Sequence, residues 1–432
     1  MLETFRNAWK ITELRKKILY TLMILVVFRV GVALPVFGVS PGALKSMVEG
    51  SGNLLGYLDM LTGGAFAKST VFALSITPYI NASIIINLLT IAIPPLERLA
   101  KEGEEGRRKL NRITRYVALG LAVALAIAYY FLLKNQNALT YTKGFSGIFS
   151  AIIIVATFTA GAMLIVWLGE QIDKKGIGNG ISLIIFAGIV SRGSTVISKA
   201  VAYFQLAAEG EYKYYIYLPI ILVLAVVVIG FVVLMTNAER RVPVQYAKRV
   251  VGRKMYGGQS SHIPIKVNMT GVMPIIFASS IISIPGTIKA LFFKNATKGF
   301  WASFLGLFDY NSLAYAIIYF MLIMAFNYFY TAVQYNPLEI ANNLRKNNGT
   351  IPGIRAGKPT VDFITRILSK VTFIGAIFLG IVAVMPIGLT AISGVNIALG
   401  GTSILIVVGV ALETVRTLEA QMMMRHHKGF LE

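Results

Sequence analysis

The side chains that most often carry chemistry are scarce in this chain. It contains no cysteine, which excludes a thiolate nucleophile, a disulfide and a cysteine metal site. Its three histidines lie outside the long apolar runs, and none of the 19 acidic residues sits well inside one. Ion-coupled transporters usually need an ionisable side chain within the membrane, and no HExxH motif of a metal hydrolase is present. The sequence therefore predicts no catalytic set, no metal site and no cofactor.

Two glycine-rich stretches resemble phosphate-binding loops without meeting their requirements. Gly176, Gly178 and Gly180 follow no predicted strand and lack the last spacing of the dinucleotide fingerprint. In the stretch 63–69, Ala67 stands where a glycine must precede the lysine. We expect no use of ATP by the chain itself, so that any driving force comes from partners.

Composition places the remaining residues in a membrane. Of the 432 residues 56% are hydrophobic and only 14% are charged, whereas soluble domains carry about 25% charged residues. A helix needs roughly 20 apolar residues to cross a bilayer. Uncharged runs supply ten such spans, and 371–412 is long enough for two, broken by Pro386, Gly388, Gly400 and Gly401. The other spans are 18–36, 69–96, 116–133, 144–169, 177–198, 214–238, 267–288 and 310–338, with Arg29 interrupting the first and Arg192 the fifth.

The basic residues predict the orientation of these spans. The formal net charge is +22, and 30 of the 41 Lys and Arg residues fall in one set of alternate loops while 10 fall in the other. Loops rich in Lys and Arg stay in the cytoplasm. Both termini are therefore expected to be cytoplasmic.

Two of the cytoplasmic loops, 238–268 and 335–370, are much longer than a turn. Asn336 is a suitable helix cap and Pro337 fits the first position of a helix, so the second loop is expected to contain one. Ordered arms that project into the cytosol are one interpretation. A solvated tether, whose charge only sets topology, is the alternative.

Ten spans divide into five plus five, and the second span of each half contains a similar string. Residues 78–86 and 274–282 are identical at six of nine positions, although chance contributes in so apolar a sequence. Halves of five spans are inverted relative to each other, which places the working site at their interface. Polar side chains beside the repeat can bond across a helix interface at about 0.6 to 2 kcal/mol each, weak enough for an interface that opens. These are Asn81, Ser83 and Asn87 in the first half and Ser279, Ser280 and Ser283 in the second.

Two apolar features accompany the repeat. Ile76 and Ile80 lie four apart on one helical face, and Ile276 is the repeat equivalent of Ile80, although isoleucine in a membrane helix is also ordinary lipid-facing or packing surface. The segment 53–67 is apolar but too short to span a bilayer, and Gly63 and Gly64 interrupt it. We expect a buried or re-entrant helix whose glycine break is covered by protein or faces a water-filled cavity.

The whole chain resembles the SecY family, the channel subunits of the bacterial Sec protein translocase. The resemblance is carried by a series of motifs: MLTGGAFAKSTVFALSITPYINASIIINLL at 60–89, KEGEEGRRKLNRITRY at 101–116, WLGEQIDKKGIGNGIS at 167–182, YAKRVVGRKMYGGQSSHIPIKVNMTGVMP at 246–274, NPLEIANNLRKNNGTIPGIRAGKPT at 336–360 and GGTSILIVV at 400–408. It implies an all-α polytopic membrane protein of ten transmembrane helices, arranged as two inverted five-helix halves, 1–200 and 201–432, around a central pore.

The resemblance also implies roles for named residues. A ring of apolar side chains seals the pore, formed by Ile76, Ile80, Ile181, Ile185, Ile276 and Ile406. The segment 53–67 corresponds to a plug, through Leu54, Leu55, Tyr57, Leu58, Met60, Leu61, Gly63, Gly64 and Phe66. A lateral gate between the second and seventh helices uses the six polar residues of the repeat. Thr77 departs from the family, which commonly has a bulkier apolar residue there.

The implied partners follow from the same resemblance. They are the SecE and SecG subunits, the SecA motor ATPase, the ribosome, signal sequences and translocating polypeptides, and membrane lipids. Basic residues in the arms match the family's contact loops for motor and ribosome, namely Arg240, Arg241, Lys248, Arg249, Arg355 and Lys358. The implied location is the bacterial cytoplasmic membrane. The alternative function is an inverted-repeat transporter of small solutes, which ten spans favour and the lack of intramembrane carboxylates opposes.

Overall fold

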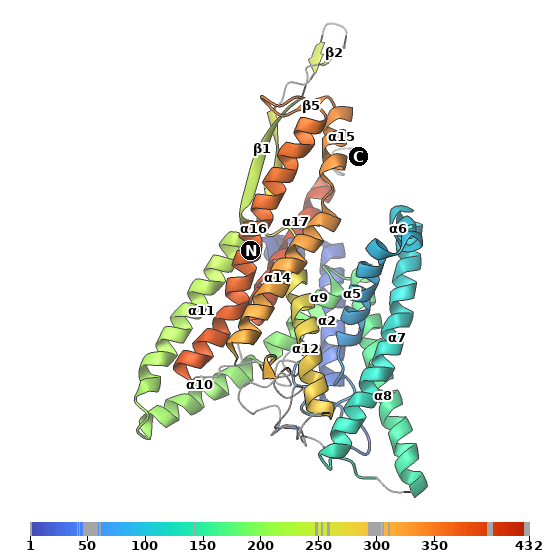
Figure 1. Ribbon diagram of the computed structural model, residues 1–432, viewed down its shortest axis with the longest axis vertical. Helices are drawn as coiled ribbons and strands as arrows, with labels where there is room; N and C mark the ends of the chain where they lie inside the picture. The colour runs from blue at the N-terminus through green and yellow to red at the C-terminus, as the bar shows by residue number, and fades with distance from the viewer. Residues whose placement is uncertain are drawn as a thin grey trace.

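The fold was analysed in a computed structural model of the chain. It describes residues 2–40, 42, 44–45, 59, 62–141, 144–246, 249–251, 254–256, 260–292, 304, 306–309, 312–394 and 401–426. Figure 1 shows an elongated bundle of helices, with a smaller unit extending from one end.

The first half of the chain contributes eight described helices. They are α1 (Leu2–Lys10), α2 (Thr12–Ala33), α5 (Thr77–Ala92), α6 (Pro94–Lys101), α7 (Glu104–Asn135), α8 (Gly144–Lys175), α9 (Gly180–Ser191) and α10 (Gly193–Ala208). The boundary predicted at residue 200 falls inside α10, which packs against the next helix in sequence. The division of the chain into halves is thus not marked by a loop at that point.

The second half contributes further helices and the strands of the two long loops. The helices are α11 (Lys213–Asn237), α12 (Met273–Phe292), α14 (Leu313–Gln334), α15 (Pro337–Lys346), α16 (Lys358–Ser393) and α17 (Gly401–His426). The strands are β1 (Glu239–Tyr246), β2 (Arg249–Val251), β3 (Lys254–Tyr256), β4 (Ser260–Lys266) and β5 (Gly349–Thr350).

Each of the ten predicted spans contains a helix, which fits the predicted class of a helical membrane protein. Six described helical stretches are long and apolar enough to cross a membrane, or seven if α5 and α6, bent by 102° at Pro94, count as one. The number of ten crossings therefore stays a prediction.

Two predicted boundaries were wrong. The span expected from residue 69 becomes helical only at Thr77, because residues 62–76 form a series of turns. Pro386 and Gly388 do not end a helix, since α16 continues to Ser393 and stops at Gly394, whose φ of 67° is the left-handed conformation that glycine tolerates.

Three apolar cores hold the bundle together. One joins α7 and α8 to the turns before α5, and another joins α11, α14 and α16 to α12 and α17. Between them lies a core that we call the central cluster, to which α2, α5, α8 and α9 contribute from the first half and α12 and α17 from the second. The central cluster is therefore the place where the two halves of the chain meet.

The outward surface of the bundle is apolar. On α11, Val223, Val226 and Val227 are each 60 to 62% exposed, and little of this helix is buried. Exposed valines on a helix of this length suit contact with lipid. This surface and the apolar helices mark a multi-pass membrane protein.

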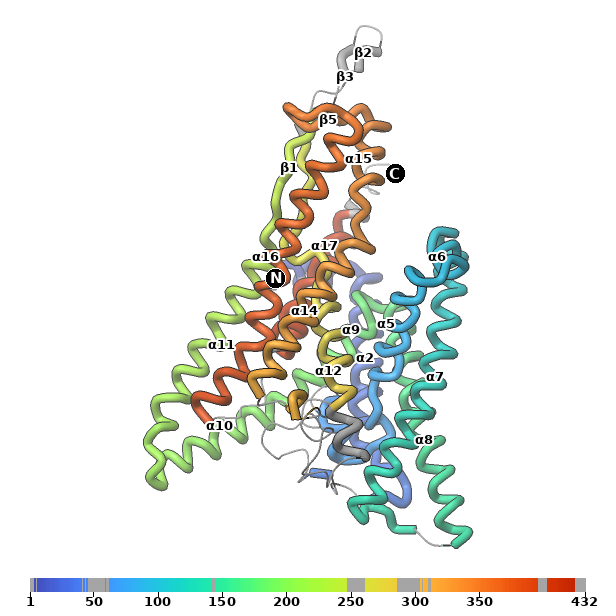
Figure 2. Tube along the Cα trace, viewed as in Figure 1, coloured from blue at the N-terminus to red at the C-terminus, as the bar shows by residue number. Residues whose placement is uncertain are grey.

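The described parts of the two long loops, 238–268 and 335–370, pack together into one unit, which we call the arm unit and which lies at the upper end of the molecule in Figure 2. Strands β4, β1 and β5 make an antiparallel sheet in that order, so that the second loop adds its strand β5 to the hairpin of the first. Asn336 caps α15 by accepting a hydrogen bond from the amide of Leu338 at 3.1 Å, as the sequence predicted. The sheet was not predicted, and the shared core of Val242, Val244, Leu344 and Ile351 excludes a slack tether.

This shared core makes a testable prediction about the two arms. Leu344 of α15 is 7% exposed in that core, whereas Leu338 of the same helix is 55% exposed. Replacing Leu344 with alanine is expected to cost about 2 to 5 kcal/mol of local stability, because a buried side chain leaves a cavity. Hydrogen exchange should then accelerate in β1 and β4 as well as in α15. Leu338→Ala is the control, and acceleration confined to α15 in the Leu344 variant would contradict a common core.

Candidate functional site

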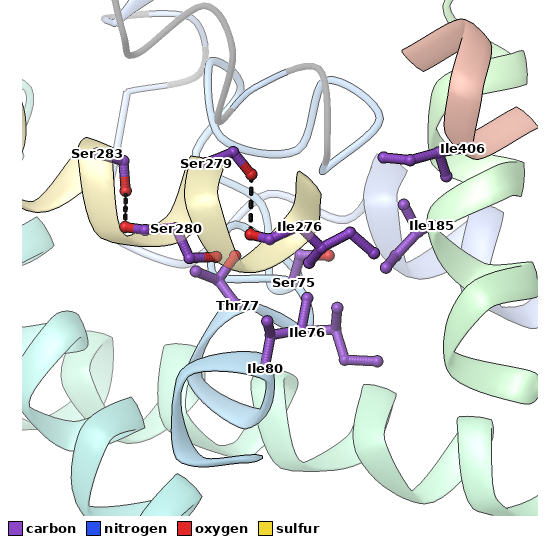
Figure 3. A pocket seen from close by; sticks show the side chains of 10 residues that line it. All are labelled: Ser75, Ile76, Thr77, Ile80, Ile185, Ile276, Ser279, Ser280, Ser283 and Ile406. Carbon is purple, nitrogen blue, oxygen red and sulfur yellow. Dashed lines mark hydrogen bonds between the residues drawn. The ribbon is translucent and has the colours of Figure 1, made fainter. Parts of the chain in front are cut away.

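A small cavity lies within the central cluster, where α5, α9, α12 and α17 meet. Figure 3 shows its lining, with isoleucines from all four elements pointing towards one another. Five of the six isoleucines of the predicted ring line it, together with four serines and Thr77. The full lining is Ser75, Ile76, Thr77, Ile80, Ile185, Ile276, Ser279, Ser280, Ser283 and Ile406. The cavity offers only about 20 Å³ to the centres of water molecules, room for one or two.

The sixth isoleucine of the predicted ring, Ile181, does not line the cavity. It is partly buried and packs against the central cluster, as Ile80 also does, while the other four isoleucines are buried members of that cluster. Ile76, Ile185, Ile276 and Ile406 are between 1 and 7% exposed. The sequence thus selected six side chains that the fold brings into one apolar cluster, and their role as a ring remains a proposal.

The repeat strings position the isoleucines of α5 and α12 in the same way. Pro78 is the second residue of α5 and Pro274 the second of α12, where the fixed φ of proline favours a helix start. Ile80 and Ile276 follow within the first turn of each helix, and the two helices contact each other. The matched sequence positions therefore occupy matched places in the two helices.

The glycine-rich turn after α8 positions the isoleucines of α9. Asn179 caps α9 by accepting from the amide of Ser182 at 3.1 Å, and Asp173 accepts from the amide of Gly180 at 2.7 Å. A Cβ atom on Gly180 would lie 2.0 Å from the backbone oxygen of Gly169 in α8. The motif that failed as a nucleotide-binding loop is thus a tight turn between two helices.

The predicted gate residues divide into two groups. Ser279, Ser280 and Ser283 of α12 line the cavity, whereas Asn81, Ser83 and Asn87 of α5 are not in its lining. Ser279 donates to the carbonyl of Ile276 at 2.9 Å, and Ser283 donates to the carbonyl of Ser280 at 2.6 Å. These donated bonds stay within α12, whereas the sequence predicted bonds across the interface with α5. Intrahelical carbonyls are close to serine hydroxyls and compete with partners on other helices.

One residue of the predicted gate lies next to a helix of the other half. Asn87 of α5 is a neighbour of Tyr330 of α14, a residue that sequence reasoning missed, while Asn87 donates a hydrogen bond to Ser83 of its own helix at 3.5 Å. Tyr330 in turn packs against Phe277 of α12, with ring centroids 4.9 Å apart. No sequence pattern singled out Tyr330 among 20 tyrosines.

The predicted plug is described only in part. Six of its predicted residues, Leu54, Leu55, Tyr57, Leu58, Met60 and Leu61, lie outside the described residues. Of the predicted segment 53–67, the structure describes Asp59, which is helical, and residues 62–67, which form a mostly buried series of turns. Gly63 and Gly64 have φ values of 67° and 90°, and Gly63 lies against Gly188 of α9, so the glycine break is covered by protein as predicted.

Phe66 of the predicted plug is buried and held by contacts with Tyr129. It is 7% exposed, and its ring lies 4.8 Å from that of Tyr129 of α7. The Tyr129 hydroxyl donates to the carbonyl of Phe66 at 2.6 Å and lies 3.1 Å from the hydroxyl of Ser69. Tyr129 was not predicted, because nothing in an apolar helix sequence distinguishes a tyrosine that faces this turn from one that faces lipid.

Comparison with known proteins decides the family. The model of the SecY family matches residues 70–415, which is more than half of the chain. The chain belongs to the SecY family. Over its full length it is 42% identical to the whole of the protein translocase subunit SecY of Streptomyces coelicolor, and 41% identical to 98% of the corresponding subunit of Thermotoga maritima.

Solved structures share the fold at lower sequence identity. A protein-conducting channel superimposes with a TM-score of 0.66 and 18% identity, covering 94% of this chain and 92% of that one. A structure in which the plug domain of SecY stabilises the closed state, and Sec61 in a canine ribosome-channel complex, each superimpose with a TM-score of 0.63 and 17% identity over the same shares. The fold of the SecY family is therefore the fold of this chain.

The described basic residues among those predicted to bind motor and ribosome lie in the arm unit. Arg240, Arg241, Arg355 and Lys358 are exposed, and Arg241 pairs with Glu239 at 2.7 Å. Arg249 lies in β2, and Lys248 is outside the described residues. Among the described residues, no group of three or more His, Asp or Glu residues could hold a metal ion.

The close approach of α9 to α8 yields a prediction about the stability of their packing. Gly180→Ala should push α9 away from α8, because the backbone oxygen of Gly169 cannot yield as a flexible side chain does. We expect a lower unfolding temperature of the purified protein in detergent. Gly193→Ala at the start of α10 is the control, since a Cβ there meets nothing within 4 Å. Equal unfolding temperatures for the two variants would contradict the tight turn.

Proposed function

We propose that this protein is the channel subunit of a protein translocase, which conducts unfolded polypeptides across a membrane. The observation that carries the proposal is the cavity closed by isoleucines of α5, α9, α12 and α17, at the junction of the two halves of a chain that belongs to the SecY family. The relatives reported above are named protein translocase subunit SecY.

An apolar constriction suits the transport of polypeptides. It offers an ion no coordinating atoms, so ions face a dewetted barrier. It offers a passing chain no strong hydrogen bonds, so segments of any sequence pass without adhering. In this proposal Ile76, Ile80, Ile181, Ile185, Ile276 and Ile406 form the ring, and the plug segment, with Gly63, Gly64 and Phe66, closes the path beside it.

Lateral release to lipid is the second part of the proposal. Helices α5 and α12 of the two halves contact each other, and Asn87 of α5 lies next to Tyr330 of α14. Interhelical hydrogen bonds in membranes contribute about 0.6 to 2 kcal/mol, so such a seam can part for an apolar segment. Signal sequences and membrane helices would leave the pore between α5 and α12.

The chain itself performs no catalysis in this proposal. The driving force comes from the SecA motor or from the ribosome, and SecE and SecG complete the complex. The location is a bacterial cytoplasmic membrane with both termini in the cytoplasm, which follows from the loops rich in Lys and Arg. The comparisons give no support to the alternative of a small-solute transporter.

Reconstituted vesicles test this function. The protein is reconstituted with SecE and SecG, and a secretory chain is arrested in transit after addition of SecA and ATP. A photo-crosslinker at Ile80 should attach to the arrested chain, because Ile80 lines the cavity. The measurement is the yield of the crosslinked product on a gel.

The control position is Val223 of α11, which is 60% exposed on the outward face and should not crosslink. Import without contact at Ile80 would reject the assigned path. Saturable uptake of a small solute, in place of import dependent on the motor, would reject the function.

The arm unit is proposed to lie in the cytoplasm and to dock the motor or the ribosome through Arg355 and its neighbours. A ribosome-bound Sec61 structure supports this placement by its shared fold. Phosphate contacts of Arg and Lys weaken as salt increases, so ribosome affinity should depend on salt.

Arg355→Glu should reduce translocation at least about tenfold, because it places a repulsive charge on the docking surface. Insertion of the channel itself should be unchanged. Arg108→Glu is the control, since Arg108 is an exposed arginine of another cytoplasmic loop. Equal translocation by the two variants would contradict docking through Arg355.

A further inference from the structure

Two arginines interrupt otherwise apolar spans of the chain. Arg29 lies in α2, and Arg192 lies at the junction of α9 and α10. A charged side chain within a membrane span is costly, and it normally pairs inside the protein. The closure of the pore by isoleucines leaves both arginines unexplained.

One arginine contacts Asp59, and the other contacts the turns of residues 62–67, to which Asp59 is bonded. Arg192 pairs with Asp59, with 2.6 Å between a guanidinium nitrogen and a carboxylate oxygen. The side chain of Asp59 is 1% exposed and that of Arg192 is 18% exposed. Arg29 donates to the hydroxyl of Ser191 at 2.8 Å and to the carbonyl of Gly63 at 3.4 Å. Charges from two helices therefore converge on one short segment.

Asp59 also holds that segment in shape. Its second carboxylate oxygen accepts from the amide of Ala67 at 2.7 Å. Its carbonyl accepts from the amide of Gly64 at 2.9 Å and from the hydroxyl of Thr62 at 3.0 Å. Asp59 thus bonds to Thr62, Gly64 and Ala67 of these turns and ties them to the junction of α9 and α10.

We propose that Asp59 and Arg192 form a latch that holds the turns of residues 62–67 in their resting position, with Arg29 positioning these turns through Gly63. The latch deepens the proposed plug and rests on the proposed function. Asp59 and Arg192 are positioning residues, since they act on the path through the segment that they hold.

An ion pair suits a contact that must break when the pore opens. The attraction between two opposite charges is strong in a dry protein interior. In bulk water it is about fourfold weaker than it is near a protein surface. Water that enters with a translocating chain hydrates both charges, so the latch weakens when the pore fills. An apolar contact would instead hold more firmly in water, because water favours the burial of apolar surface.

The absence of cysteine allows a direct test in the full complex. Ala67→Cys introduces the single cysteine of the chain at a position that is 9% exposed. Closed vesicles without motor are treated with a membrane-impermeant maleimide, and the labelling rate is measured. Asp59→Asn and Arg192→Gln should each accelerate labelling at least about tenfold, because a lone buried charge is more costly than a pair.

The double variant Asp59→Asn with Arg192→Gln should label more slowly than either single variant, since it leaves no buried charge without a partner. Arg192→Lys keeps the charge and should label close to the parent rate. Arg108→Gln, in an exposed pair with Glu104, is the control for loss of an arginine.

Labelling at the parent rate in both single variants would overturn the latch. Additive effects in the double variant would overturn it too, because residues that act as a pair are not additive. A variant that fails to fold is recognised by gel filtration, and Arg192→Lys then carries the comparison. Labelling does not require translocation, so accelerated labelling without import would uphold the latch and reject the proposed function.

Discussion

The structure depends on one constraint, that no backbone polar group can be left unpaired where water is excluded. The turns of residues 62–76 would be forbidden against lipid, and hydrogen bonds made within the protein hold them. Thr62 accepts from the amide of Phe66, and Ser69 and Leu34 accept from the amides of Val36 and Val71. Helices α7, α8 and α9 surround these turns, and the start of α5 follows directly from them. The irregular segment thus fixes where α5 begins and, through it, where the isoleucines lie.

The central cluster follows from that placement. Because α5 begins only at Thr77, Ile76 and Ile80 lie at the start of a helix rather than in its middle, and α12 begins in the same manner beside it. Helices that start at the same depth bring their first turns together, and α9 and α17 supply the remaining isoleucines. In the proposed function the seal is consequently made of side chains from both halves and, in α5 and α12, from helix starts. A movement of one half relative to the other would then change its width without unfolding a helix.

The sequence allowed prediction of what depends on local pattern. Uncharged length located the helices, Asn336 with Pro337 located the cap of α15, and motif positions selected six isoleucines that share one cluster. It did not allow prediction of contacts between distant segments. The strand β5 pairs with β1 across more than 100 residues, and Tyr129, Tyr330 and Asp59 are ordinary in their local sequence. The late start of α5 was missed because turns and helices are equally apolar when both are buried, so hydropathy cannot separate them.

The chain combines two kinds of contact that respond oppositely to water. The isoleucine cluster holds together because water favours the burial of apolar surface, and it re-forms around any chain that leaves. The contact of Asp59 with Arg192 is strong only while it is dry. A path closed by isoleucine alone would tighten as water approached, and one closed by charges alone would leak ions through their hydration shells. With both contacts, entry of a hydrated polypeptide would loosen the turns of residues 62–67, while the isoleucine cluster would still exclude ions around that polypeptide.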